Sequence, residues 1–233
     1  TQRQFSANAA HELRTPLTVM QTKLDVLQKQ KEPTPQEYKE TAAMLSEQIN
    51  RLSDLVSVLL EMTEMQTVQR TDEIALSALV EEVLCDLAQI ADNKGVKLIQ
   101  ERGEAIMIGS DPLIYRAVYN LVENAIKYAA NEKILRIYLE ERGKVVRIWV
   151  FDTCDPVPEE VLRHLFDSFY KADKSRGLEK QSYGLGLAIV KAIAELHGCQ
   201  YGVEQQSDGL SFWFELPKVD MDAQEEEPED WEE

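Results

Sequence analysis

The first 68 residues carry two runs of apolar side chains that repeat at alternating spacings of three and four residues. Such a repeat places one apolar stripe along an α-helix and is typical of helices that pack side by side. A break at Pro33, Thr34 and Pro35 separates the runs. The sequence therefore predicts two long antiparallel helices joined by a short turn. The repeating positions are Ala10, Leu13, Leu17, Met20, Leu24 and Leu27, then Leu45, Ile49, Leu52, Val56 and Leu59.

A lone helical hairpin of this kind leaves much of its apolar stripe in contact with water. A second hairpin would cover the stripe, so we expect residues 1–68 to form a homodimeric four-helix bundle. The alternative is that the hairpin packs on the rest of its own chain.

Glycine marks the end of this helical region. The first 68 residues contain none, whereas all ten lie between residues 95 and 209, which predicts a domain boundary between 68 and 75. Beyond it, helical and strand-like patterns are mixed, which predicts an α/β sandwich over residues 75–217, with helices on one face of a mixed sheet. The expected helices are 76–92, 111–129 and 185–196, and the expected strands are 96–101, 135–140, 145–151 and 211–216.

The acidic residues are concentrated at the C-terminal end. The formal net charge is −17, and residues 219–233 hold nine acids and no base. We therefore expect 218–233 to form a disordered acidic tail. The remainder is mildly acidic, which argues against nonspecific DNA binding.

Several classes of protein are excluded by what the sequence lacks. No apolar run reaches the roughly 18 residues that a membrane-spanning helix needs. No P-loop motif occurs, which excludes a P-loop NTPase. Three widely spaced cysteines, Cys85, Cys154 and Cys199, argue for a reducing compartment and against a metal site. The chain opens at Thr1 inside a helical pattern, so we expect a fragment of a longer protein.

His11 is the first residue that could carry chemistry. It falls just outside the apolar stripe, with Glu12 beside it, Thr15 four residues on and Pro16 at a bend in the helix. An imidazole is a competent nucleophile at neutral pH, and a neighbouring carboxylate can hold its tautomer. The alternative is a solvent-facing histidine with no role.

A second group of polar residues lies on the predicted helix 111–129. Asn120 and Asn124 are four residues apart on one face and are followed by Lys127 and Tyr128. Two amides and an ammonium on one face could hold a divalent cation and phosphate oxygens. The alternative is a polar outer stripe.

Two further features point to a nucleotide. Gly184 and Gly186 precede a helix, where backbone N–H groups suit phosphate, although Ile189 breaks the dinucleotide fingerprint. Asp152 ends an apolar strand, where its carboxylate could accept from an exocyclic amine such as that of adenine. The alternatives are an ordinary glycine loop and an aspartate that caps a turn.

Together, residues 1 to about 217 resemble the transmitter core of the sensor histidine kinases of two-component systems. FSANAAHELRTPLTVM is similar to the family's phosphoacceptor box. The resemblance implies that His11 is phosphorylated, that Glu12 is its acid–base partner, and that Thr15 positions water when the response regulator is dephosphorylated.

Three more segments resemble the family's nucleotide-binding boxes, in the family's order and spacing. NLVENAIKYA is similar to the N box, LFDSFYKADKSR to the F box and YGLGLAIV to the second glycine box. The resemblance assigns Mg²⁺ to Asn124 and the packing of the ATP lid's base to Phe166 and Phe169. The residues that it implies for ATP binding are Asn120, Asn124, Lys127, Tyr128, Asp152, Lys171, Gly184 and Gly186.

The family's first glycine box, Asp-x-Gly-x-Gly, is altered. The chain reads Asp152, Thr153, Cys154, Asp155, Pro156, so the adenine-binding aspartate remains and both glycines are gone. If the loop keeps the family's path, Cys154 is strained and Pro156 removes an amide donor. If the loop has its own path, no strain arises.

The resemblance implies a gyrase- and Hsp90-like ATPase domain and a membrane-associated bacterial transferase, of which this chain is the cytoplasmic portion. It implies ATP and Mg²⁺ as cofactors, a homodimer, and a response regulator receiver domain as partner. The predicted function is autophosphorylation of His11 and transfer to an aspartate of the regulator. Two alternatives are a phosphatase-only or scaffold protein with weakened ATP binding, and a generic ATPase resembling Hsp90.

Overall fold

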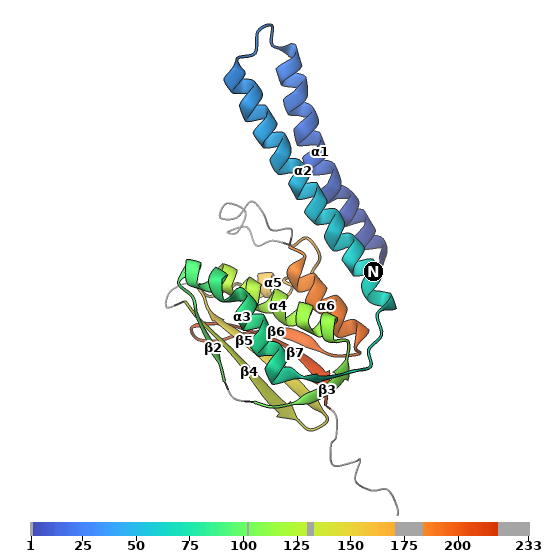
Figure 1. The fold of residues 1–233 in the computed structure, drawn as a ribbon, viewed down its shortest axis with the longest axis vertical. Coiled ribbons are helices and arrows are strands. Elements are labelled where there is room, and N and C mark those ends of the chain that lie inside the picture. Colours follow the sequence, from blue (N-terminus) through green and yellow to red (C-terminus); the bar gives the residue numbers. More distant parts are fainter. Residues whose placement is uncertain (1, 102, 130–132, 171–183, 219–233) are drawn as a thin grey trace, which may run out of the picture. The chain divides into compact units, whose positions relative to one another are not determined.

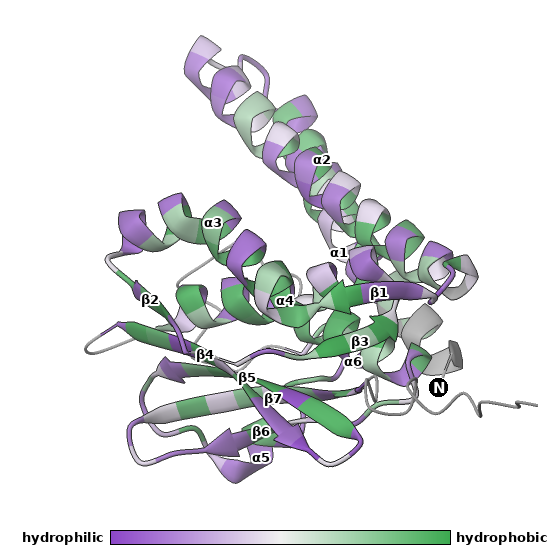
Figure 2. Cartoon of the chain, turned by 60° about the horizontal axis from the view of Figure 1, so that its bottom comes forward, coloured by the Kyte–Doolittle hydropathy of each residue, from purple (hydrophilic) through white to green (hydrophobic). Residues whose placement is uncertain are grey.

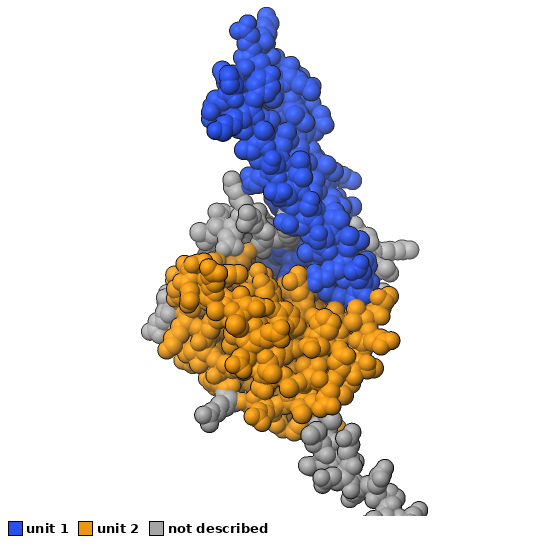
Figure 3. Space-filling model, in the orientation of Figure 1, with its two compact units in different colours: residues 1–66, 164–188 blue, residues 67–163, 189–233 orange. Residues whose placement is uncertain are grey.

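The computed structural model describes residues 2–101, 103–129, 133–170 and 184–218. The chain divides into two compact units (Figure 3). One comprises Thr1–Gln66 and His164–Ala188, and the other comprises Thr67–Arg163 and Ile189–Glu233. Of the predicted acidic tail, all but Lys218 lies outside the described residues.

Two long helices make up most of the first unit (Figure 1). α1 spans Gln2–Lys29 and α2 spans Pro35–Glu64, and the short 3-10 helix η1 (Met65–Thr67) follows. The two long helices pack against each other as an antiparallel hairpin. The hairpin predicted from the seven-residue repeat is therefore confirmed.

The start of α2 is fixed by a local capping arrangement. The Glu37 backbone N–H donates to Thr34 Oγ1 at 3.3 Å, and the Thr34 backbone N–H donates to the Glu37 carboxylate at 2.7 Å. The bonds that its carboxylate accepts from the Thr34 backbone N–H and hydroxyl lower the pKa of Glu37. Pro35 occupies the first turn, where a missing N–H breaks no helical bond. A cap of this kind stabilises a helix by about 1 kcal/mol. The residues that interrupt the apolar repeat, Pro33 to Pro35, therefore also determine where α2 begins.

Part of the predicted apolar stripe remains exposed in the single chain. Leu17, Ile49 and Val56 are 52%, 53% and 43% exposed, whereas Leu55 on the neighbouring face is 1% exposed. Figure 2 shows hydrophobic and hydrophilic residues interspersed along α2. The hairpin therefore keeps an uncovered apolar face of the kind that helix bundles bury.

The second unit is built on a five-stranded mixed sheet (Figure 1). Its strand order is β2-β4-β5-β7-β6, with β2 parallel to β4 and the other neighbours antiparallel. A separate pair, β1 and β3, forms a two-stranded antiparallel sheet. The strands are β1 (Asp72–Ala75), β2 (Lys97–Gln100), β3 (Ile106–Gly109), β4 (Ile134–Arg142), β5 (Val145–Thr153), β6 (Tyr201–Gln205) and β7 (Gly209–Pro217).

Helices cover one face of this sheet, as predicted (Figure 1). They are α3 (Leu76–Lys94), α4 (Asp111–Tyr128) and the C-terminal part of α6 (Gly186–Leu196), and the single-turn helix α5 spans Glu159–Leu162. Each predicted helix ends within about two residues of the observed one, the usual uncertainty of helix ends. In the part of the chain that the structure describes, no helix is both long enough and apolar enough to cross a bilayer.

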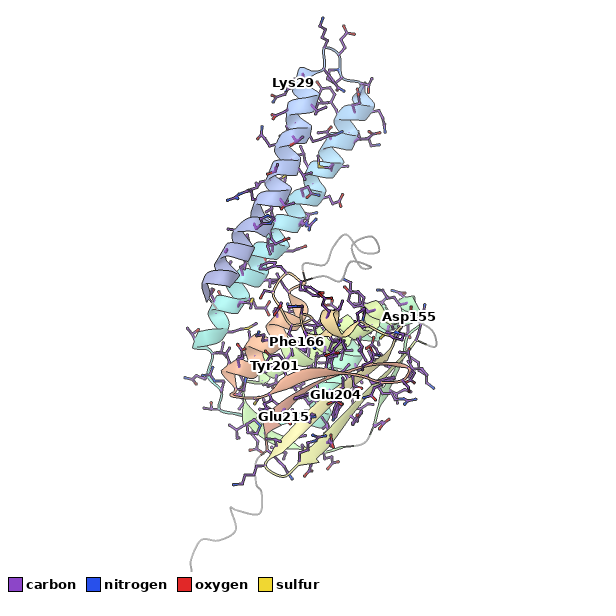
Figure 4. The ribbon with its side chains drawn as sticks, turned by 180° about the vertical axis from the view of Figure 1, so that it is seen from behind. Lys29, Asp155, Phe166, Tyr201, Glu204 and Glu215 are labelled. Carbon is purple, nitrogen blue, oxygen red and sulfur yellow. The ribbon has the colours of Figure 1, made fainter. Side chains whose placement is uncertain are left out.

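The central strand β5 is buried on both faces. Ile148 and Val150 alternate along the strand on one face and are fully buried. On the other face, Trp149 stacks on Tyr138 with 5.9 Å between ring centroids, and the Arg147 guanidinium lies 5.1 Å from the Trp149 ring. Arg147 also forms an ion pair with Glu215, which Figure 4 labels on β7. This double burial explains why the strand is apolar in the sequence apart from Arg147 and its last two residues, Asp152 and Thr153.

Candidate functional site

The predicted phosphoacceptor segment lies within α1. His11 is exposed and Glu12 is half-buried. The Thr15 hydroxyl donates to the His11 backbone carbonyl at 3.2 Å. The helix continues through Pro16, which is buried and has no N–H to donate to the Glu12 carbonyl. The histidine therefore lies on the solvent side of the hairpin, beside a carboxylate and one turn from a hydroxyl.

The predicted N-box residues lie along α4, in the second unit. Asn120 is 5% exposed, and its Nδ2 donates to the Arg116 carbonyl at 2.8 Å. Asn124 and Lys127 are half-buried, and Tyr128 is exposed with the Lys127 Nζ 5.4 Å from its ring centroid. Because Asn120 is buried, these residues do not form the polar outer stripe that the sequence left open as an alternative. They run from the buried side of α4 to its exposed C-terminal end.

Asp152 lies near the end of β5 and is 2% exposed. Its Oδ1 has no hydrogen-bond partner among the described residues. Burial raises the pKa of this carboxyl to about 7. A buried acceptor without a donor costs free energy, and such groups in proteins commonly serve a ligand. Oδ1 of Asp152 is therefore a buried acceptor with no donor among the described residues, and it can accept from a ligand.

The loop that replaces the first glycine box follows β5. Among the described residues, the only non-glycine positions with positive φ are Lys133 and Phe169, so Cys154 is not strained. Of the two alternatives that the sequence left open for this loop, the structure has the one without left-handed strain at Cys154. Burial, with the Asp152 carboxylate as a second cause, raises the pKa of the Cys154 thiol to about 12. That thiol is therefore not a nucleophile.

The predicted F box and second glycine box meet through their backbones. The Phe169 N–H donates to the Gly184 carbonyl at 3.0 Å, and Phe169 has φ +69°. Gly184 has φ +67°, and a Cβ there would lie 2.3 Å from the Tyr170 carbonyl oxygen. Only glycine fits this position. Gly186 is the first residue of α6.

The predicted residues fall in both units. Asn120, Asn124 and Asp152 belong to the second, in which α4 packs against β5. Those in the first unit are His11, Glu12, Thr15, Phe166, Phe169, Gly184 and Gly186. Lys171 lies outside the described residues.

Metal binding was predicted through Asn124 alone. Within the described ranges, no three side chains of the types His, Cys, Asp and Glu are grouped so that they could hold a metal. An amide oxygen is a suitable ligand for Mg²⁺ when nucleotide phosphates supply others. The half-exposed Asn124 fits that use, and it is not a resident metal centre by itself.

The sequence patterns missed Gln205 at the end of β6 and Gly209 at the start of β7. Gln205 accepts from the Val157 N–H, and Gly209 packs against the Asp152 backbone carbonyl. Nothing local in the sequence signals this, because the contact joins segments about fifty residues apart.

Two family models match the chain. The His Kinase A (phospho-acceptor) domain matches residues 1–67. The histidine kinase-, DNA gyrase B- and HSP90-like ATPase matches residues 109–220. The first match contains His11, and the second contains the residues predicted to bind ATP.

Curated relatives and solved structures agree with these matches. The probable sensor protein PcoS of Escherichia coli is 33% identical over 213 residues, which cover 89% of this chain and 45% of PcoS. The sensor histidine kinase CusS of Escherichia coli K12 is 30% identical over 220 residues, covering 93% of this chain and 45% of CusS. The solved Acinetobacter baumannii histidine kinase AdeS is 25% identical, with a TM-score of 0.63, covering 89% of this chain and 97% of that one.

The chain spans about half the length of these curated relatives. Their similarity nevertheless extends across both the hairpin and the sandwich, and each of these regions matches its own family model. The chain therefore belongs to the sensor histidine kinase family.

Proposed function

We propose that this chain is a kinase core that transfers the γ-phosphoryl group of ATP to His11 and then to an aspartate of a response regulator. The buried Asp152 Oδ1, which has no partner within the described ranges, carries the proposal, because it needs a donor such as the adenine amine. The exposed His11 supplies an accessible acceptor for the phosphoryl group.

In the nucleotide site, Asp152 accepts from the adenine amine, and Asn120, Lys127 and Tyr128 lie around the nucleotide. Asn124 would hold Mg²⁺, which when bound would supply charge neutralisation at the phosphates. The N–H groups around Gly184 and Gly186, and Lys171, serve the phosphates.

At the acceptor, a neutral His11 ring nitrogen forms the bond to the γ-phosphorus while the bond to the bridging oxygen of ADP breaks. The proton on the other ring nitrogen passes to Glu12. Thr15 already donates to the His11 carbonyl, so its hydroxyl oxygen can accept from a water. This water would hydrolyse the phosphorylated aspartate of the regulator in the reverse, phosphatase direction.

The partners follow from the hairpin. The exposed apolar residues on α1 and α2 fit a homodimeric four-helix bundle. A solved complex pairs the histidine kinase ThkA with the response regulator protein TrrA, at a TM-score of 0.69 over 93% of this chain. We extend that pairing to this chain as a proposal.

The boundaries 1–68, 75–217 and 218–233, and a place as the cytoplasmic portion of a membrane protein, also remain proposals. The phosphatase-only alternative rested on the altered glycine box. It is not favoured, because the relatives are sensor kinases and the loop after Asp152 is unstrained.

The first prediction concerns His11 as the acceptor of the phosphoryl group. Incubation with γ-labelled ATP and Mg²⁺ is expected to give a phosphoprotein that acid hydrolyses and base does not, as is typical of phosphohistidine. His11→Gln should abolish the label. His164→Gln, which changes another exposed histidine, is the matched control and should keep it. Label that persists in His11→Gln, or that survives acid, would contradict the assignment.

A further inference from the structure

The loop after β5 is held by the turn that joins β6 to β7. The Cys154 N–H donates to the Asp208 carbonyl at 3.3 Å, and the Val157 N–H donates to Gln205 Oε1 at 2.9 Å. These two bonds bracket Asp155 and Pro156, which are exposed. The segment that lost both glycines is therefore fixed at each end by the same neighbouring turn.

The Gln205 side chain is the centre of this arrangement. While its Oε1 accepts from Val157, its Nε2 donates to the carbonyls of Gly209 at 2.8 Å and of Gln206 at 3.1 Å. The three partners determine which end of the amide is oxygen, because an N–H faces one end and two carbonyls face the other. No other side chain of similar length supplies one acceptor and two donors in this geometry.

The same turn also approaches Asp152 itself. A Cβ at Gly209 would lie 2.0 Å from the Asp152 backbone oxygen, so only glycine allows the two strands to come this close. In the β5–β7 pair, Asp152 is opposite Leu210, and Thr153 is opposite Gly209. Figure 4 labels Glu204, the β6 residue before Gln205, and Asp155 in the clamped loop.

A loop without glycine cannot adopt left-handed backbone freely, and Pro156 contributes no N–H, so this loop has little support of its own. We propose that Gln205 is a positioning residue for nucleotide binding: it clamps residues 154–157 and thereby fixes the loop beside the Asp152 carboxylate, where the adenine amine would bind. This inference rests on the proposed binding of ATP at Asp152.

The test compares Gln205→Leu with Gln206→Leu. Both residues are exposed, and only the backbone of Gln206 takes part in the clamp, so Gln206→Leu is a matched control. Titration with a non-hydrolysable ATP analogue and Mg²⁺ should give a Kd about five- to tenfold higher for Gln205→Leu, the effect of losing one well-formed hydrogen-bond cluster. Gln206→Leu should bind like the unchanged chain.

Two readouts separate positioning from general damage. In autophosphorylation, KM for ATP should rise for Gln205→Leu while kcat at saturating ATP stays within about twofold. Hydrogen exchange should accelerate at the Val157 amide while the β5–β7 amides stay protected. A Kd equal to that of the control would overturn the clamp, as would a kcat and a Tm that fall together. If the unchanged chain itself binds no nucleotide, the proposed function fails instead.

Discussion

The two segments that correspond to the family's glycine boxes differ in what determines the path of their backbone. The segment at Gly184 keeps its glycine at φ +67°, packed against the Tyr170 carbonyl where no Cβ fits. The segment after Asp152 has lost its glycines and takes a path without positive φ, held by Gln205 and Asp208. A glycine is therefore indispensable where backbone packs on backbone, and replaceable where a neighbouring turn supplies hydrogen-bond partners.

The largest effect should come from Gly184→Ala. An alanine here would be strained in the left-handed backbone conformation, and its Cβ would also clash with the Tyr170 carbonyl oxygen. We therefore expect nucleotide binding to weaken at least about thirtyfold, the equivalent of about 2 kcal/mol. Gly198→Ala is the matched control, because Gly198 has φ +66° and no atom within 4 Å of the added Cβ. Titration of both variants isolates the clash. Equal losses of nucleotide affinity in the two variants would show that backbone strain alone matters, and would contradict the role given to the contact with Tyr170.

A smaller effect should follow the ionisation of Asp152. With a pKa of about 7, the ionised acceptor is depleted below that pH, so affinity for the nucleotide should fall about tenfold between pH 8 and pH 6. Asp152→Asn should bind more weakly at pH 8 and lose this part of the pH dependence. The phosphates of the nucleotide also titrate in this range, and their contribution is the same for the unchanged chain and for Asp152→Asn. Subtracting one pH series from the other therefore leaves the contribution of Asp152.

The same substitution makes a second test, on stability. The folded-state pKa of Asp152 lies above its unfolded value, so its favourable contribution is full below about pH 4 and is lost as the pH rises through about 7. Asp152→Asn should therefore raise Tm at pH 8 and have less effect at pH 5. A lower Tm at pH 8 would mean that the carboxylate has a partner in the folded protein.

The smallest effect should come from restoring the glycines. Because Cys154 is not strained, Cys154→Gly with Pro156→Gly has no strain to relieve and only adds backbone freedom. We expect a Kd that is unchanged or at most about threefold higher. Cys154→Ala with Pro156→Ala removes the same side chains without glycine and serves as the control. Binding that tightens about tenfold in the glycine variant would restore the strain argument.

The sequence predicted the helical elements best. The alternating spacing of three and four located the hairpin, and the break at Pro33–Pro35 coincides with the capping box that begins α2. These signals are local, because a helix bonds to its own next turn. The patterns missed β1, β3 and β6, which have four or five residues each. Such short strands depend on partners far along the chain, which periodicity does not detect.

Local patterns in the sequence are enough to predict the order of the motifs, the hairpin with its apolar stripe, and an α/β sandwich with a polar pair on one helix. Long-range packing decided the burial of Asn120 and Asp152, and it leaves the Asp152 Oδ1 without a donor among the described residues. It also decided the path of the altered loop, since Gln205 and Gly209 lie about fifty residues beyond it. Burial and clamping result from contacts between distant segments, and no short stretch of sequence contains both partners.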